Sequence, residues 1–333
     1  MKKKSKIAVV TGGAGFIGSH MVDLLIKKNF IVNVIDNFSG GHKKNLVHMI
    51  KNPNLKLINQ DICNIKKNNK YFKNAKYVFH FAGIGDIVPS IQKPLDYMNT
   101  NIQGTARVLE AARYYKVKKF VYAASSSCYG ITKSITSENH RIDPLYPYAF
   151  SKYLGEQTVL HWNKVYGLQC NIIRIFNAYG TRVRTTGAYG AVFGVFFKQK
   201  LKGKPLTIVG NGKQKRDFIY VTDVAEAFLA AAETKKNNEI FNLGAGKPQT
   251  IKYLVSLLSN KTIKIPDRPG EPKVTWANTK KIKKFLKWQP KVSFNDGVKM
   301  MLKDINNWKD APLWTPKKIK EATKLWFKFM NHK

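Results

Sequence analysis

Apolar and polar positions alternate along the chain in blocks that predict strands and helices. Residues 7–10 form a short apolar run, which is typical of a buried parallel strand. After a glycine-rich turn, apolar side chains recur at helical spacing at Phe16, Ile17, Met21, Leu24 and Leu25. A second apolar run follows at residues 31–36. This first block therefore predicts a strand, a helix and a second strand.

The same alternation continues to about residue 178. Further strands are predicted at residues 55–58, 77–81, 120–123 and 170–176, with helices between them, for example at 97–115 and 150–166. Such alternation predicts an α/β fold of the Rossmann type, a doubly wound parallel sheet covered by helices on both faces. Ligands of these sheets bind at the carboxyl ends of the strands.

Beyond residue 178 the pattern loosens into segments rich in Gly, Lys and Pro. We expect residues 1–180, with about 217–245, to form the sheet domain. Residues 181–216 and 246–333 should form a smaller C-terminal α/β domain that binds the substrate. Two segments, 218–221 with the helix that follows and 240–243, should return to the sheet domain, and Asp223 and Glu226 should form a capping box on that helix.

The turn after the first strand has the spacing of a dinucleotide-binding loop. Gly12, Gly15 and Gly18 allow a sharp turn, a close approach to a pyrophosphate and tight packing of the next helix. The helix N-terminus adds partial positive charge. Asp36 ends the second strand, where its carboxylate would bind ribose hydroxyls and repel a 2′-phosphate. These features predict NAD rather than NADP as the cofactor, and a plain tight turn with Asp36 as a strand cap is the alternative.

Tyr148 and Lys152 lie four residues apart, and therefore on one face of a predicted helix. Free tyrosine is a poor base at neutral pH because its pKa is about 10. An ammonium group roughly 6 Å away, at an effective dielectric of about 20, favours the phenolate by roughly 3 kcal/mol, or about two pKa units. We therefore expect Tyr148 to act as a general base, and an exposed surface pair is the alternative.

Together these motifs resemble the extended short-chain dehydrogenase/reductase family, and within it the NAD-dependent nucleotide-sugar epimerases and dehydratases. The resemblance covers nearly the whole chain and implies that Ser125, Tyr148 and Lys152 are catalytic. It implies cofactor contacts from Gly12, Gly15, Phe16, Ile17, Gly18, Asp36, Asn37, Ser39, Asp61, Ile62, Phe81, Ala82, Gly83, Asn101, Tyr148, Lys152 and Phe176. The implied substrate site comprises Ser125, Ser126, Tyr148, Asn177, Arg216, Arg268, Glu271 and Thr275.

The run Ser125-Ser126-Ser127 separates members of this family. In the dehydratases and decarboxylases that the chain resembles, an acidic residue follows the catalytic hydroxyl by one or two positions, where this chain has Ser126 and Ser127. The resemblance therefore implies epimerisation at carbon 4 through a 4-keto intermediate, with UDP-glucose and UDP-galactose as the default pair. A UDP-N-acetylhexosamine or UDP-uronic acid epimerase is the alternative, and a 4,6-dehydratase or reductase is less favoured.

Two positions bear on the choice of sugar. Thr275 stands where related epimerases carry a bulky tyrosine when they are restricted to plain hexoses, so a threonine favours N-acetyl sugars weakly. Arg182 or Arg184 would suit the carboxylate of a uronic acid, and ordinary surface charge is the alternative for both.

Charge does not change this interpretation. The chain has 58 Lys and Arg against 20 Asp and Glu, a formal net charge of +38. The lysines are scattered and form no basic stripe with aromatic residues, so we expect general lysine enrichment and no nucleic-acid partner. An NAD-sensing protein that binds nucleic acid is the alternative outside the enzymes.

The remaining features concern location and assembly. Cys63, Cys128 and Cys170 lie far apart, which fits reduced thiols and no metal site. No apolar run is long enough to span a membrane, and residues 1–4 are followed by only four apolar residues before the glycine turn, so we expect a cytoplasmic protein. The resemblance implies a homodimer. Residues 314–330 place Ile319, Ala322, Trp326 and Phe329 on one helical side, which favours core or dimer packing over a membrane-surface helix.

Overall fold

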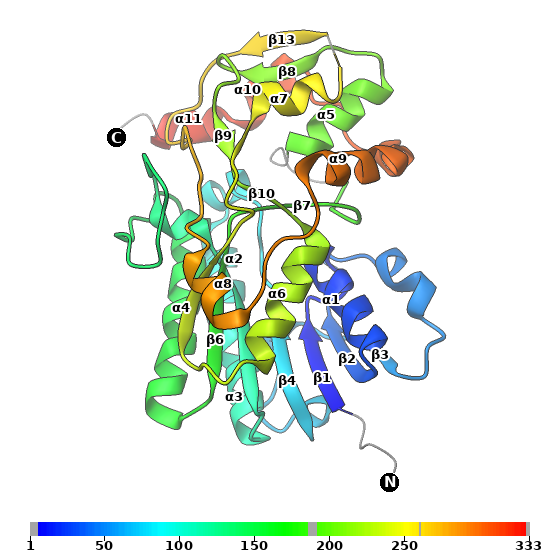
Figure 1. The fold of residues 1–333 in the computed structure, drawn as a ribbon, viewed down its shortest axis with the longest axis vertical. Coiled ribbons are helices and arrows are strands. Elements are labelled where there is room, and N and C mark those ends of the chain that lie inside the picture. Colours follow the sequence, from blue (N-terminus) through cyan, green and yellow to red (C-terminus); the bar gives the residue numbers. More distant parts are fainter. Residues whose placement is uncertain (1–5, 186–191, 260, 331–333) are drawn as a thin grey trace.

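The computed structural model describes residues 6–185, 192–259 and 261–330. At its centre is a seven-stranded parallel sheet with the order β11-β6-β5-β4-β1-β2-β3 (Figure 1). Its strands are β1 (Lys6–Thr11), β2 (Phe30–Asp36), β3 (Leu55–Asn59), β4 (Ala75–His80), β5 (Lys119–Ser125), β6 (Cys170–Ile175) and β11 (Glu239–Leu243). The order reverses between β1 and β4, as it does in doubly wound folds. The predicted fold class is confirmed.

Helices cover both faces of the sheet. On one face α1 (Phe16–Lys27), α6 (Val221–Glu233) and α8 (Lys280–Leu286) bury an apolar cluster that includes Val10, Phe79 and Phe228. On the other face α3 (Thr105–Tyr114) and α4 (Pro147–Tyr166) bury a second cluster around Phe120 and Val159. Because both faces are covered, the strands are apolar along most of their length.

The helix predicted at residues 97–115 is interrupted. The structure has a short helix α2 (Pro94–Met98), a π-helical turn η5 (Asn99–Gly104) and then α3. Asn101 lies in this π turn, which widens the helix beside the carboxyl end of β4. Such π turns are frequent at functional sites.

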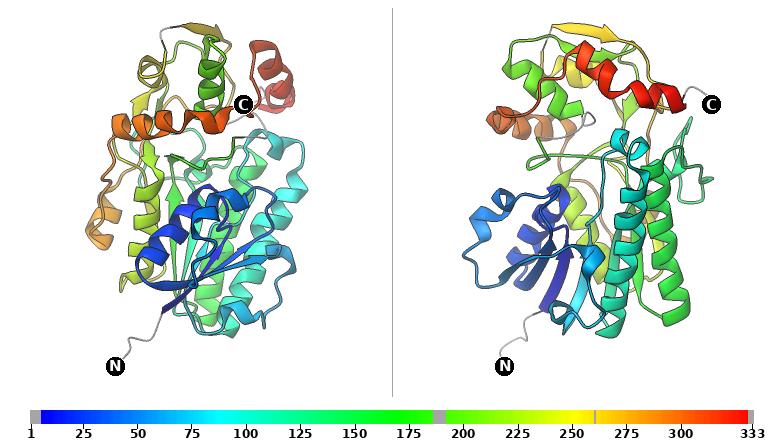
Figure 2. Two further views of the ribbon diagram at one scale, coloured as in Figure 1. Left: turned by 90° about the vertical axis from the view of Figure 1, so that its right-hand side faces the viewer. Right: turned by 180° about the vertical axis from the view of Figure 1, so that it is seen from behind.

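A smaller layer of helices and short strands lies over the carboxyl ends of the sheet (Figures 1 and 2). It contains two pairs of short strands, β8 (Leu206–Val209) with β13 (Thr262–Ile265) and β9 (Lys215–Arg216) with β12 (Gln249–Thr250). Its helices are α5 (Val192–Leu201), α7 (Ile251–Ser256), α9 (Phe294–Lys303), α10 (Pro316–Ala322) and α11 (Lys324–Met330). These elements share a third apolar cluster around Phe196, Leu254 and Trp308.

The two strands between residues 217 and 245 lie in different sheets. β11 forms an edge of the main sheet, as predicted. The strand β10 (Phe218–Tyr220) pairs with β7 (Asn177–Tyr179) and not with the main sheet, because the chain leaves the sheet after Ile175, whereas the helix α6 that follows it packs on the sheet domain beside α1. These two short strands connect the sheet to the smaller layer.

The capping box predicted at the start of α6 was wrong. Tyr220 is the N-cap residue and its side chain makes no capping bond. Asp223 lies in the first turn and accepts hydrogen bonds from the backbone N–H groups of Lys291 (3.1 Å) and Val292 (3.0 Å). Its carboxylate therefore ties the segment before α9 to the start of α6.

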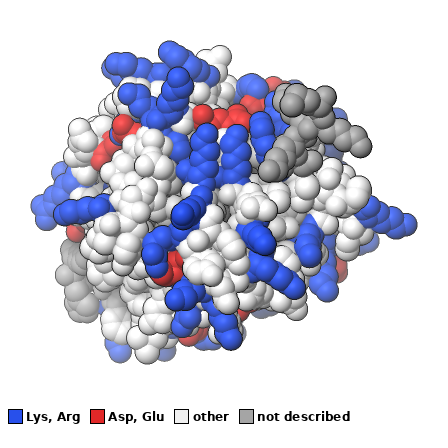
Figure 3. Space-filling model, turned by 90° about the horizontal axis from the view of Figure 1, so that it is seen from below, with Lys and Arg blue, Asp and Glu red and all other residues white. Residues whose placement is uncertain are grey.

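Basic side chains are distributed over the surface. Seen from below the sheet, Lys and Arg are spread among uncharged residues, with a few Asp and Glu between them (Figure 3). This distribution agrees with general lysine enrichment. Within the described ranges, no helix combines the length and apolar character that a membrane span requires.

Candidate active site

The glycine turn is shaped by close contacts that exclude larger side chains. Gly12 has φ +68°, and a Cβ there would lie 2.6 Å from the backbone nitrogen of Ala82. A Cβ on Gly18 would lie 2.2 Å from the carbonyl oxygen of Gly12, so α1 packs directly on the turn. Gly15 differs, because a Cβ there would meet only the Gly12 oxygen, at 3.1 Å. The turn is thus tight behind Gly12 and Gly18 and open at Gly15, where a pyrophosphate would approach.

Asp36 is fixed beside this turn. Its two carboxylate oxygens accept hydrogen bonds from the backbone N–H groups of Ala14 (2.9 Å) and Phe38 (2.8 Å). Burial raises the pKa of Asp36, and the hydrogen bonds from the two backbone N–H groups act against that rise. Each carboxylate oxygen can accept more than one hydrogen bond, so Asp36 retains capacity for ribose hydroxyls. It therefore serves as the strand-end cap and still fits the ribose role.

Further predicted cofactor residues line the same end of the sheet. Asn37 donates to a carboxylate oxygen of Asp61 (2.8 Å), and the backbone and hydroxyl of Ser39 donate to the side-chain oxygen of Asn37. Asp61 caps the 3-10 turn η2 (Ile62–Asn64) by accepting from the backbone of Cys63. The residues after β2 and β3 therefore form one hydrogen-bonded wall, as adjacent parallel strands require.

The residues after β4 meet the π turn. The side-chain oxygen of Asn101 accepts from the backbone of Ile84 (2.8 Å), and its amide donates to the hydroxyl of Ser151 (2.9 Å). A Cβ on Gly83 would lie 2.8 Å from that same oxygen of Asn101. Glycine at position 83 thus leaves room for the position that Asn101 adopts here. Phe81 lies alongside, with its backbone bound to Thr11 (3.0 Å) and its ring against Phe228.

This end of the sheet fits NAD. The cradle at Gly15, the uncapped N-terminus of α1 and the fixed Asp36 are the groups that a dinucleotide requires. Phe16 and Ile17 begin α1 directly behind the turn. No group of His, Cys, Asp and Glu that could hold a metal occurs among the described residues.

The catalytic candidates converge where β5 ends and α4 begins. Ser125 is the last residue of β5, and Tyr148 and Lys152 occupy the first turns of α4. The Ser125 hydroxyl interacts with the phenol of Tyr148 and acts to lower its pKa. The ammonium of Lys152 lies 4.4 Å from the ring centroid of Tyr122. The end of β5 and the start of α4 therefore place Ser125 and Tyr148 in the same cavity wall, with Lys152 on the next turn of the helix.

Electrostatics in the protein alone differ from the sequence expectation. We expected Lys152 to lower the pKa of Tyr148, but burial raises it, and the interaction with Ser125 only partly opposes that rise. Burial also lowers the pKa of Lys152 to about 7, against the opposing influence of the Glu156 carboxylate. The expectation was wrong because desolvation penalises both charged forms at this depth.

Sequence reasoning missed a buried ion pair behind the catalytic helix. Glu156, one turn after Lys152, binds Arg174 of β6 through two hydrogen bonds of 2.6 and 2.9 Å. Arg174 also donates to the hydroxyl of Tyr129, which donates to the Asn242 side chain. The i to i+4 spacing of Lys152 and Glu156 was the available signal. This network fixes α4 against β6, and Glu156 stabilises the ammonium form of Lys152.

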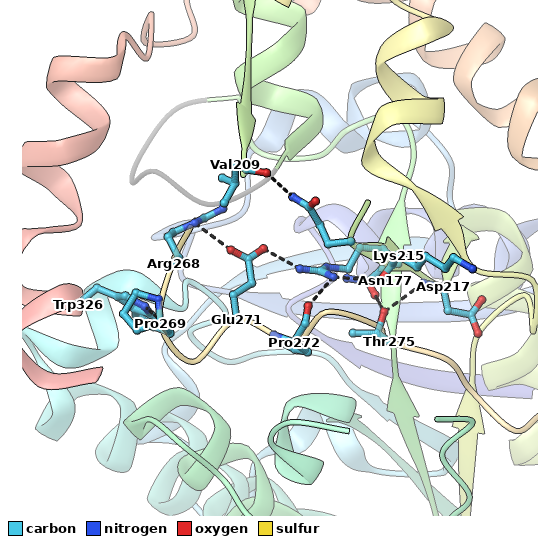
Figure 4. Close-up of polar contacts among 12 residues, drawn as sticks. Asn177, Val209, Lys215, Asp217, Arg268, Pro269, Glu271, Pro272, Thr275 and Trp326 are labelled. Atoms are coloured by element: carbon cyan, nitrogen blue, oxygen red, sulfur yellow. Dashed lines mark hydrogen bonds and ion pairs between the residues drawn. The ribbon is translucent and has the colours of Figure 1, made fainter. Parts of the chain in front are cut away.

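The predicted substrate residues surround a cavity of about 450 Å³. Arg216 of β9 pairs with Glu271 (2.6 Å) and donates to the carbonyl oxygen of Pro272 (2.8 Å), while Arg268 pairs with the second oxygen of Glu271 (2.9 Å; Figure 4). One carboxylate thus holds two guanidinium groups. The predicted residues that line the cavity are Ser125, Ser126, Tyr148, Phe176, Asn177, Arg216, Arg268, Glu271 and Thr275.

Thr275 is bound into the cavity wall. Its hydroxyl donates to the side-chain oxygen of Asn177 (2.6 Å) and accepts from the backbone N–H of Asp217 (3.1 Å), as Figure 4 shows. Asp217 is fully buried and accepts from the backbone of Gly246 and Ala277. Burial raises its pKa to about 6. Thr275 is therefore held between the strand β7 and the segment that follows β9.

The two arginines considered for a uronic acid have different surroundings. Arg182 pairs with Asp23 of α1 (2.7 Å) and does not line the cavity. Arg184 pairs with Asp86 (2.6 Å), and Asp86 does line the cavity. Surface charge is therefore the better interpretation of Arg182, whereas Arg184 lies one side chain away from the cavity.

Comparisons with known proteins agree with this geometry. Residues 8–244 match the NAD dependent epimerase/dehydratase family. The UDP-glucose 4-epimerase of Thermotoga maritima, solved with UDP-glucose, superposes with a TM-score of 0.84 at 33% identity, over 90% of this chain and 99% of that chain. The UDP-glucuronic acid 4-epimerase of Bacillus cereus, solved with UDP-glucuronic acid and NAD, gives 0.84 at 34% identity, over 90% and 99%.

A third solved structure extends the range of sugars. The UDP-N-acetylglucosamine 4-epimerase of Methanobrevibacter ruminantium, in complex with UDP-N-acetylmuramic acid, superposes with a TM-score of 0.84 at 32% identity, over 91% of this chain and 100% of that chain. The resemblance inferred from the motifs is confirmed, since the family match covers well over half of the sequence. The chain belongs to the NAD dependent epimerase/dehydratase family.

Proposed function

We propose that the protein is an NAD-dependent epimerase that inverts carbon 4 of a UDP-sugar. The observation that carries this proposal is that Ser125 and Tyr148 line the same cavity as Arg216 and Arg268, with Lys152 one turn after Tyr148 on α4. Guanidinium groups suit a diphosphate because their donors form a planar fork. A proton-transfer site and a diphosphate site therefore share one chamber.

In the proposed reaction, Tyr148 removes the proton from the hydroxyl on carbon 4 while Ser125 holds that oxygen. Lys152 favours the phenolate when its ammonium is protonated. NAD, when bound, would accept a hydride from carbon 4 and later return it to the same carbon. If the 4-keto sugar turns within the chamber, Tyr148 protonates the returning oxygen on the opposite face.

The cavity wall favours epimerisation over dehydration. Ser126 and Ser127 line the cavity at the positions where the resemblance implies an acid in dehydratases. Asp86 is an acid in the wall, and its carboxylate is paired with Arg184. An elimination at carbons 5 and 6 would need a free acid and base near Ser125, and these wall positions supply hydroxyl groups instead.

UDP-glucose and UDP-galactose are the proposed default pair. A UDP-N-acetylhexosamine is the second candidate, and the short side chain of Thr275 in the cavity wall favours it. A UDP-uronic acid is the third, and the position of Arg184 beside Asp86 favours it. A product of this kind would serve as a sugar donor in polysaccharide assembly.

The proposed division into domains keeps residues 1–180 and about 217–245 with NAD, and residues 181–216 and 246–333 with the nucleotide sugar. We also propose a homodimer that forms through the face of α4. Phe150, Val165 and Tyr166 are exposed there, by 43%, 53% and 49%. A hollow lined by Leu154, Leu160 and Trp162 lies beside them. A cytoplasmic location is proposed because the three cysteines are free thiols, which a reducing compartment maintains.

Product analysis tests the proposed function directly. Purified protein is incubated with UDP-glucose, UDP-galactose, UDP-N-acetylglucosamine and UDP-glucuronic acid, and the products are resolved by NMR. The proposal predicts interconversion of one pair that differs only at carbon 4, with no added NADH consumed. A 4-keto-6-deoxy product, or net consumption of NADH, would contradict it.

Removal of the Tyr148 hydroxyl tests whether this residue is the base. Tyr148→Phe should lower kcat by about 10²–10⁴, which is the usual contribution of a positioned general base. Binding of NAD and UDP should persist, because the ring remains. Tyr153→Phe, one turn further along α4, is the matched control and should keep normal turnover. Equal turnover in Tyr148→Phe and the control would remove Tyr148 from the mechanism.

A further inference from the structure

The C-terminal helix α11 lies against the wall of the substrate cavity. Trp326 of this helix lines the cavity together with residues of both layers of the molecule. Its side chain is buried, with 6% exposed. The sequence predicted only core or dimer packing for this segment, and the exposure of Phe329 (53%) shows that its apolar residues divide between two faces.

Trp326 connects the catalytic end of the cavity with the arginine loop. Its indole N–H donates to the carbonyl oxygen of Pro269 (2.8 Å), next to Arg268 (Figure 4). Its ring lies 5.2 Å from the ring of Tyr146, measured between centroids. The ring of Tyr146 is in turn parallel to that of Tyr148, at 6.4 Å. An aromatic chain therefore runs from the proposed base to the C-terminal helix.

The arginine loop is also fitted closely to α11. Gly270 has φ +70°, and a Cβ there would lie 2.5 Å from the terminal methyl of Met330 and 4.0 Å from the Trp326 ring. The positive φ of Gly270 strains any other residue there, and a larger side chain would also displace the terminal methyl of Met330. On its other side α11 contacts the short turn η4 (Val88–Ile91), which belongs to the sheet layer. The helix thus bridges the two layers across the sugar end of the cavity.

We propose that Trp326 is a specificity-determining residue that walls the sugar chamber. Its aromatic face would pack on the apolar C–H face of the hexose and limit the space in which the 4-keto sugar turns. Arg216 and Phe218 also line the cavity, and we place the nucleotide beside them because the Arg216 guanidinium suits the diphosphate. Trp326 therefore acts on the sugar and leaves the UDP group untouched. This inference rests on the proposed function of the same cavity.

Three variants test the wall. Trp326→Ala removes the ring, Trp326→Phe keeps an aromatic face without the N–H group, and Phe329→Ala changes an exposed neighbour on the same helix. We measure kcat/KM for UDP-glucose and for the bulkier UDP-N-acetylglucosamine. Trp326→Ala should shift the ratio of the two values toward the bulkier sugar by about tenfold or more, as pocket enlargement does elsewhere. Trp326→Phe should shift it less, and Phe329→Ala should leave it unchanged.

A merely structural role would give a different result. If Trp326→Ala lowers both kcat/KM values equally, or if Phe329→Ala shifts their ratio as much, the inference is overturned. Thermal unfolding identifies a variant that fails to fold. If Trp326→Ala does not fold, the ratio of the two kcat/KM values for Trp326→Phe is compared with the wild-type ratio instead. A ratio for folded Trp326→Phe and Trp326→Ala that equals the wild-type ratio also overturns it.

Binding separates the failure of this inference from that of the proposed function. A wild-type protein that interconverts no UDP-sugar contradicts the proposed function alone. Calorimetric titration with UDP and with UDP-glucose then tests whether Trp326 contacts the sugar, without requiring turnover. Trp326→Ala should weaken UDP-glucose binding about tenfold and change UDP binding by less than about twofold, and equal changes for both ligands contradict the wall.

Discussion

The two ends of the active site are built differently. At the cofactor end, the glycine turn presents backbone amides, and the carboxylate of Asp36 is fixed by two backbone N–H groups. At the substrate end, charged side chains hold one another, because Glu271 pairs with both Arg216 and Arg268. The first end is formed in advance, whereas the second has charge pairs that a diphosphate must replace.

The difference matches what an epimerase requires of its two ligands. A cofactor that is regenerated in every cycle is best kept bound, and a rigid backbone site loses little conformational freedom on binding. A substrate enters and leaves in every cycle, so its binding groups need another partner while the site is empty. For Arg216 and Arg268 this partner is Glu271. Glu271 keeps the two guanidinium groups in place, and a diphosphate would take over their hydrogen bonds.

The largest effect on binding should come from Arg216. The residue is 9% exposed and its guanidinium faces the cavity. Arg216→Met should weaken UDP binding by about 2–5 kcal/mol, a loss of roughly 30-fold or more, because one partner of a buried charged interaction is removed. Titration calorimetry with UDP measures this, and NAD affinity should stay unchanged.

A double variant identifies the cause of that loss. Arg216→Met leaves Glu271 with one partner fewer, and this alone disturbs the loop. In the variant Arg216→Met with Glu271→Gln, that carboxylate is neutralised. UDP binding should remain weak if the guanidinium contacts the diphosphate. Recovery of wild-type affinity in the double variant would show that Arg216 acts only on the loop.

A smaller effect is expected at the cofactor end. Asp36→Ala should weaken NAD binding by about 1.5–3 kcal/mol, the usual value for hydrogen bonds to a charged group, and UDP binding should not change. Discrimination against NADP should also fall. Asp23→Ala is the matched control, because Asp23 is a carboxylate of α1 that pairs with Arg182 outside the cavity. Equal NAD affinities for the two variants would contradict the role of Asp36.

Per pH unit, the smallest expected effect is that of Lys152 on stability, and this residue lies on the catalytic helix between the two ends. Burial lowers the pKa of Lys152 to about 7, whereas an unfolded lysine titrates near 10.4. Between those values the unfolded chain holds the extra proton, so the free energy of unfolding of the ligand-free protein should rise with pH. The slope from this group is at most about 1.4 kcal/mol per pH unit.

Urea unfolding of wild type and Lys152→Met at pH values from about 7 to about 10 isolates this slope. Other groups titrate in both proteins, so the informative quantity is the difference between them. The stability of the wild type should gain on that of the variant as pH rises. Parallel stabilities across this range would show that Lys152 has an ordinary pKa in the folded protein.

Sequence patterns predicted the cofactor end better than the substrate end. The glycine turn, Asp36 and the strand ends follow one another within short stretches, and the spacing of Tyr148 and Lys152 places both on one helical face. The substrate residues Arg216, Arg268, Glu271 and Thr275 were proposed from resemblance, since they come from separate loops with no local pattern. The sequence around Trp326 contains no pattern that distinguishes a residue of the cavity wall from one of ordinary packing.

The sequence by itself determined the α/β class, the strand and helix positions and the groups at the strand ends, because periodicity and turn chemistry act over a few residues. Only the tertiary structure decided that residues 218–220 pair with β7, that Asp223 holds the segment before α9 and that Trp326 reaches the cavity. It also decided the pKa directions of Tyr148 and Lys152. These properties depend on burial and on contacts between residues far apart in the chain, and both arise only when the layers pack.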